Sequence, residues 1–130
     1  ALRLQPESVQ ALAAMAEAEL GMSELAAAER HAARVLDREP SHGIASLVMG
    51  MIRLEQRDYE SARDHLIEAV TTDPESPKAH YQLSLAYARL GDMEMSREHR
   101  ERYRSALETM ERQLEEVRSR LGIQKGGMQP

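Results

Sequence analysis

Apolar side chains recur along most of this chain at the three- and four-residue intervals that place them on one face of an α-helix. Between Ser8 and Gly21, for example, Val9, Leu12 and Leu20 follow this spacing. Strand signals are weak, because β-branched residues are few and no segment alternates apolar and polar residues with period two. The pattern therefore predicts an all-α protein.

Turn residues and prolines divide the helical pattern into six segments. Gly21, Gly91 and the run 56–58 interrupt it, and Pro40 and Pro74 stop helices because proline cannot continue them. Ser76 and Asp92 are residue types that cap helix N-termini. The expected helices are 8–21, 24–38, 42–54, 59–71, 76–90 and a long one over 92–121.

A fixed period organises these segments. Prolines stand at positions 6, 40 and 74, and the small residues Ala28, Ala62 and Ser96 repeat at the same interval. A further proline would fall at Glu108, so the array should end there. The expected divisions are a remnant of a preceding repeat at 1–7, repeats at 8–41, 42–75 and 76–103, a helical extension at 104–121 and a disordered tail at 122–130. The remnant implies that the natural protein extends upstream of Ala1.

The middle and last segments carry residues of a known repeat pattern. In the middle segment they are Gly50, Tyr59, Ala62, Leu66, Ala69 and Pro74, and in the last they are Tyr81, Leu83, Tyr87, Gly91 and Asp92. Through these residues and the 34-residue period, the chain resembles the tetratricopeptide repeat family. The first segment fits less well, since Glu19 stands where the family usually has an aromatic residue.

The resemblance implies a right-handed α-solenoid of antiparallel helix pairs, here followed by a long C-terminal helix. It also implies a concave groove, lined by the first helix of each pair, that binds an extended peptide or short helix of a partner. By the period, the groove residues are Ala13, Glu17, Ile44, Leu47, Val48, Met51, Lys78, Tyr81, Gln82, Leu85 and Arg89. Some family members clamp a chaperone's C-terminal carboxylate with Lys, Arg and Asn, but this chain has no Asn.

The middle of this groove is strongly apolar, and two interpretations of it are open. Leu47, Val48 and Met51 could form a patch that faces a ligand, because exposed apolar patches often mark interaction sites. Alternatively they pack against neighbouring helices, because a helix that is apolar on most of its circumference is normally buried all round.

Three histidines, His31, His65 and His99, recur at the period of the repeats and raise the question of a metal site. Packed helices lie about 8–10 Å apart, whereas zinc holds its ligands at about 2 Å. We therefore expect no metal and interpret these histidines as duplicated residues at tolerated surface positions. His42 and His80 look isolated.

Other chemistry is sparse. The chain has no cysteine, no Gly-rich phosphate loop and no His-Glu-x-x-His motif, so no catalytic site and no cofactor are expected. With 17 basic and 22 acidic residues and no basic stripe, nucleic acid is not an expected partner. No apolar run is long enough for a membrane span. The compartment is left open: cytoplasmic is the default, and because the chain begins at Ala1 a removed targeting segment stays an alternative.

A different pattern begins at Tyr103. Apolar residues follow it at intervals of 4, 3, 4, 3 and 4, the a/d spacing of helices that pair. This spacing predicts self-association, giving a possible homodimer, or a capping helix that covers the end of the array. The self-association residues are Leu107, Met110, Leu114, Val117 and Leu121.

The function predicted from the sequence is a non-catalytic protein–protein interaction module that binds its partner in the groove. Two alternatives stay open. The chain could be a structural element that dimerises through its C-terminal helix, or the regulatory part of an enzyme whose catalytic domain precedes Ala1.

Overall fold

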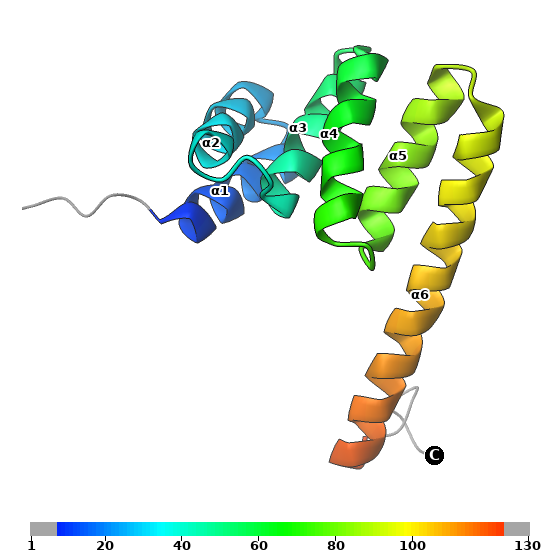
Figure 1. Ribbon diagram of the computed structural model, residues 1–130. Coiled ribbons are helices and arrows are strands. Elements are labelled where there is room, and N and C mark those ends of the chain that lie inside the picture. The colour runs from blue at the N-terminus through cyan, green and yellow to red at the C-terminus, as the bar shows by residue number, and fades with distance from the viewer. Residues whose placement is uncertain (1–7, 124–130) are drawn as a thin grey trace, which may run out of the picture.

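The computed structural model describes residues 8–123, which form six α-helices and no strand. The helices stand side by side in sequence order as three antiparallel pairs (Figure 1). This confirms the expected all-α solenoid, and each helix begins and ends within one residue of its expected position. The helices are α1 (Val9–Gly21), α2 (Leu25–Arg38), α3 (Gly43–Glu55), α4 (Tyr59–Thr72), α5 (Pro77–Arg89) and α6 (Met93–Leu121). The expected repeat remnant and all but the first two residues of the expected tail lie outside the described residues.

Polar side chains fix where most of these helices begin. At five of the six described helices, the residue before the first turn accepts a hydrogen bond from the backbone amide three positions later. Such caps satisfy an amide that has no partner within the helix. The capping residues are Ser8, His42, Asp58, Ser76 and Asp92.

The turn inside each repeat uses the same backbone conformation three times. Ser23, Arg57 and Gly91, which occupy equivalent positions in the three repeats, have φ angles of 62°, 62° and 84°. Side-chain-bearing residues avoid this left-handed region because their Cβ approaches the following carbonyl oxygen, whereas glycine adopts it freely. Only the third repeat therefore has the residue that suits its turn.

Replacing Arg57→Gly should stabilise the protein. Removal of the Cβ strain is worth about 1–2 kcal/mol, and the added freedom of the unfolded chain offsets about half of that. We expect a higher midpoint in urea denaturation. Gly91→Ala at the equivalent turn should lower the midpoint, and an unchanged midpoint in both variants would contradict this account of the turns.

The buried side chains form two clusters, and α3 contributes to both. We define the N-terminal cluster as Leu12, Ala13, Ala16, Ala28, Ala32, Val35, Ala45, Val48, Met49 and Ile52. The C-terminal cluster is Leu47, Ala62, Leu66, Ala69, Ala79, Leu83, Ala86 and Tyr87. Because Val48 and Leu47 point into different clusters, α3 joins the first repeat to the third, as the repeated burial in solenoids requires.

Small residues allow the two helices of a repeat to approach closely. A Cβ added to Gly50 of α3 would lie 2.5 Å from Cγ of Leu66 on α4, and 3.4 Å from the carbonyl oxygen of Ala62. In the third repeat the equivalent residues are Ser84 and Ser96, and the Ser96 hydroxyl donates to the Ser84 carbonyl oxygen at 2.9 Å. At Gly50 no space is left for a larger side chain.

Ala62→Leu should therefore destabilise the protein by about 1–3 kcal/mol, because Ala62 is fully buried and the added methylenes would force α3 and α4 apart. Thermal unfolding measures the loss. Ala26→Leu, the same change at an exposed position of α2, is the matched control and should alter stability little. Equal melting temperatures for the two variants would show that the crossing tolerates bulk.

The last helix is about twice as long as the others. α6 has 29 residues, about 44 Å at 1.5 Å per residue, and its last buried residue is Ala106. Beyond that residue it projects past the other helices as a single rod (Figure 1). Its end is set by Gly122, whose φ of 72° forms a left-handed C-cap.

Candidate partner-binding cleft

A cleft of about 640 Å³ opens on the side of the array where the turns within the repeats lie. It is formed by the C-terminal halves of α3 and α5 together with the α1–α2 and α3–α4 turns. The residues that line it are Leu20, Ser23, Leu25, Met51, Leu54, Glu55, Arg57, Tyr59, Gln82, Leu85 and Arg89.

The lining combines an apolar floor with charged groups. Leu20 and Leu25 are half-buried against the N-terminal cluster, whereas Met51 and Leu54 are half-buried against the C-terminal cluster. The floor therefore runs along the seam between the two clusters. The exposed residues Glu55, Arg57 and Arg89 supply the charges. Such a surface can take up apolar side chains and pair with charges beside them.

Four of the groove residues expected from the sequence meet in this cleft: Met51, Gln82, Leu85 and Arg89. Three others do not reach it, because Ala13 and Val48 are 1 % exposed and Leu47 is 9 % exposed. For Leu47 and Val48, the structure follows the alternative in which they pack between helices.

The remaining expected groove residues lie elsewhere. Ile44 and Leu47 line a separate hollow of about 260 Å³, between the N-termini of α3 and α5. Tyr81 packs on Tyr103 of α6, with ring centroids 5.1 Å apart. Glu17 is exposed on α1, and Lys78 is exposed at the start of α5.

The sequence reasoning missed the part of the cleft that comes from turns and helix ends. Leu20 and Leu54 are equivalent by the period of the repeats, and each lies one helical turn after a residue that had been assigned to the groove, Glu17 or Met51. Extending each stripe by a turn would have found them. Arg57 and Tyr59 enter through the bend between α3 and α4, which a helical period does not describe.

The periodic histidines have a structural role that corrects their assignment to tolerated surface positions. Two of them contact a residue on the first helix of their own repeat. His31 Nδ1 is 2.7 Å from Oε1 of Glu19, and His99 stacks on Tyr87 with ring centroids 5.7 Å apart. His99 is only 8 % exposed. In the middle repeat, His65 lies in the field of Arg53.

His80 is not isolated, as the sequence had suggested, but buried against His99. Its Nε2 lies 2.7 Å from the Pro74 carbonyl oxygen, and since a carbonyl only accepts, Nε2 carries the hydrogen. Nδ1 of His80 lies 3.1 Å from Nδ1 of His99, so a second hydrogen bond joins the two rings. These bonds tie the α4–α5 turn, α5 and α6 together.

In the described part of the chain, no three His, Asp or Glu side chains come close enough to hold a metal ion. Nor is any helix within 8–123 both long and apolar enough to cross a membrane.

Two of these histidines should make stability depend on pH. Burial is the main cause that lowers the pKa of His65 and His99 below the ordinary 6.5, and nearby Arg53 and His80 respectively add to it. As pH falls below 6.5, the unfolded chain therefore binds more protons than the folded protein does. The stability that these two histidines contribute is fully present above pH 6.5 and is lost as pH falls through their lowered pKa values.

We expect the melting temperature to drop between about pH 7.5 and pH 5.5. In His65→Gln and His99→Gln the drop should be smaller, because a group that titrates differently in the two states has been removed. A melting temperature that rises at pH 5.5, or a slope that neither variant changes, would show that these rings are not held neutral.

The a/d residues of α6 form an apolar stripe on its projecting part. Their exposed fractions are 38 % for Leu107, 44 % for Met110, 49 % for Leu114 and Val117, and 67 % for Leu121. All five are exposed, and the last part of α6 extends beyond the other described helices (Figure 1).

Comparison with known proteins gives the family. A family model described as Tetratricopeptide repeat matches residues 13–66 and 47–106, which together span well over half of the chain. The chain belongs to the tetratricopeptide repeat family, whose repeats generally act as interaction modules rather than catalysts. It matches no curated protein sequence.

Solved structures share the fold at low sequence identity. A Yersinia enterocolitica type III secretion translocator chaperone, SycD, is 12 % identical with a TM-score of 0.70, over 93 % of this chain and 91 % of that one. The second repeat domain of Spaghetti (RPAP3), bound to an HSP90 peptide, is 15 % identical with a TM-score of 0.68, over 75 % of this chain and 90 % of that one. An O-GlcNAc transferase mutant from Thermobaculum terrenum is 26 % identical with a TM-score of 0.60, over 75 % of this chain but only 20 % of that one.

Proposed function

We propose that the protein is a non-catalytic module that binds a peptide or short helix of a partner protein in the cleft between its repeats. The single observation that carries this proposal is the 640 Å³ cleft, whose half-buried leucines and methionine stay within reach of a ligand. The HSP90 peptide bound by the repeats of RPAP3 supports it, since a similar fold binds a peptide.

The lining suggests the chemistry of the ligand. Arg57 and Arg89 stand against one acidic residue, Glu55, in a chain whose net charge is −5. A segment with two or three apolar residues and an acidic neighbour would bury its apolar side chains and pair its charge. A chaperone-type carboxylate clamp does not fit this lining, because the chain has no Asn to share that role.

Peptides selected from a random displayed library on the intact protein provide the test. Leu85→Glu, at the cleft, should weaken their binding by about tenfold or more, because it places an unpaired charge where apolar side chains dock. Ile67→Glu is the matched control, since Ile67 is 39 % exposed on α4 outside the cleft. Equal loss in both variants, with both still folded by circular dichroism, would refute the cleft as the binding site.

Self-association through α6 is a second candidate function. It is favoured by the exposed stripe, whose five side chains would be worth about 1.5–3 kcal/mol each if fully buried. The stripe and the cleft are separate surfaces, so a dimer formed by α6 would leave the cleft open.

A further inference from the structure

The apolar stripe of α6 continues the face that α5 covers inside the array. Leu114 lies about five whole helical turns after the fully buried Ser96, so both point in the same direction. Val117 stands in the same relation to His99, which is buried against His80 of α5. Past the N-terminus of α5, no described helix lies alongside α6 (Figure 1), and a further helix would fit there.

The polar residues on α6 show which helix fits that place. Positions on either side of an a/d seam face the partner's flanking residues and select its orientation. On one flank the sequence has Arg104, Glu111 and Arg118, and on the other Ala106, Gln113 and Arg120. Alternating charges on the first flank are complementary to the same flank of a second copy that runs in the opposite direction.

We propose that the stripe is covered by the same stripe of a second copy, in an antiparallel two-fold pair. This inference rests on the self-association proposed above. Leu114 packs opposite Val117 of the second copy, and Met110 packs opposite its Leu121. Glu111 then faces Arg118 of the second copy, and the two-fold axis repeats this ion pair. Gln113 faces Arg120 in the same way.

Other registers fit the charges or the array less well. Sliding the copies seven residues further over each other would place Glu111 opposite Glu111 and Arg104 opposite Arg118, which repel. A slide of fourteen residues would bring the second copy's Leu121 to the level of Ser96, which is fully buried by the array.

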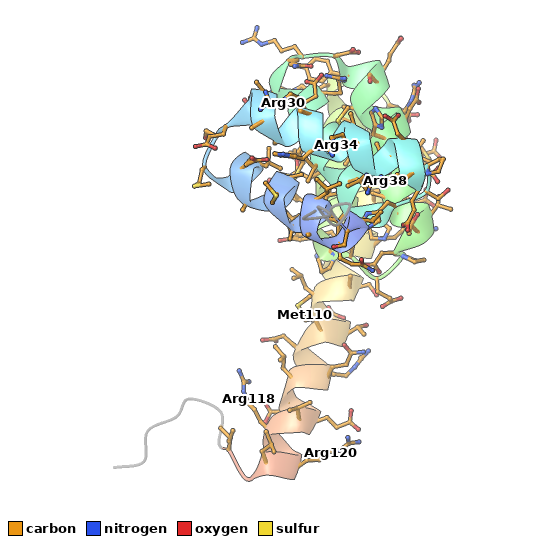
Figure 2. All side chains as sticks on the ribbon, turned by 90° about the vertical axis from the view of Figure 1, so that its left-hand side faces the viewer. Arg30, Arg34, Arg38, Met110, Arg118 and Arg120 are labelled. Atoms are coloured by element: carbon orange, nitrogen blue, oxygen red, sulfur yellow. The ribbon has the colours of Figure 1, made fainter. Side chains whose placement is uncertain are left out.

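A parallel pair is excluded by the shape of each chain. The partner's residues 93–106 would then lie against the face of α6 that α5 already occupies, where Tyr81 contacts Tyr103. A parallel pair would also form no ion pair between its flanking residues, because Gln113 would face Arg118 and Ala106 would face Glu111. In the antiparallel pair the two arrays lie at opposite ends (Figure 2 shows Met110, Arg118 and Arg120 along the free part of α6).

The interface is small. Met110 to Leu121 is twelve residues, about 18 Å of helix, and so the pair should form only at high protein concentration. Within its own helix Arg118 makes an exposed contact of 3.5 Å to Glu115. Arg118 can turn from this contact towards a second copy at little cost, because exposed ion pairs of this kind contribute little.

Disulfide cross-linking tests the orientation, because the chain has no cysteine of its own. Met110→Cys and Leu121→Cys are mixed at high concentration and oxidised gently, and the products are separated by mass. The antiparallel pair predicts the crossed 110–121 product, since like positions lie about 16 Å apart along the axis. Predominance of the 110–110 and 121–121 products would overturn the proposal.

Sedimentation with charge variants tests the register. Arg118→Glu should raise the dissociation constant of the dimer about tenfold by placing it against Glu111. The double variant Glu111→Arg/Arg118→Glu should restore the dissociation constant. Because this variant also lacks the contact between residue 118 and Glu115, its recovery shows that the loss in the single variant comes from the interface and not from a less stable helix. If the double variant does not recover, the proposed register is wrong. If the intact chain and the Leu114→Glu variant are both monomers at high concentration, self-association itself is wrong. Peptide binding in the cleft is measured in the same samples and should be unchanged, so failure here is distinct from failure of the cleft.

Discussion

The close crossing of the two helices within each repeat is the contact on which the rest of the structure depends. At Gly50 the backbone of α3 lies so near Leu66 that even a methyl group would collide, and at Ser96 the same approach is closed by a hydrogen bond to Ser84. Ala62 and Leu66, which face Gly50 across this crossing, both belong to the C-terminal cluster. The crossing within the second repeat therefore shares residues with the contact between the second and third repeats.

Both proposed binding surfaces follow from this arrangement. The cleft lies along the seam between the two clusters, where the side chains of Leu20 and Met51 are only partly buried against the core. The α6 stripe arises because the helix is longer than the array it covers. Its inner half is held by Ser96 and His99, and its outer half presents the same face, where Leu114 and Val117 are each 49 % exposed. The cleft thus results from the stacking of the repeats, and the α6 stripe results from the length of α6.

The sequence predicted the fold well, because a fixed period constrains every repeat at once. Pro40, Pro74 and the caps at Ser76 and Asp92 marked helix ends that the structure has, and the small residues marked the period. Burial on α3 was harder to read. Its apolar residues allowed either a ligand patch or packing, and only the positions of the neighbouring helices decide that Val48 is enclosed while Met51 is not.

Side chains that pair across helices were the part that periodicity could not predict. The pairs Glu19–His31 and Tyr87–His99 have the same sequence separation, and each spans a turn whose bend depends on a left-handed residue, Ser23 or Gly91. A period identifies equivalent residues in different repeats, but it does not say which residues within one repeat face each other. For the same reason His80 looked isolated although it is bonded to His99.

The proposed binding site lies on the side of the first helices, in the seam between the two clusters. Photo-cross-linking addresses it most directly, with a benzophenone side chain placed at Gln82 in the cleft or at Ile67 on α4 and a library-selected peptide as the probe. We expect the peptide to cross-link to the protein carrying the group at Gln82 and not to the one carrying it at Ile67. Equal or stronger cross-linking from Ile67 would contradict it.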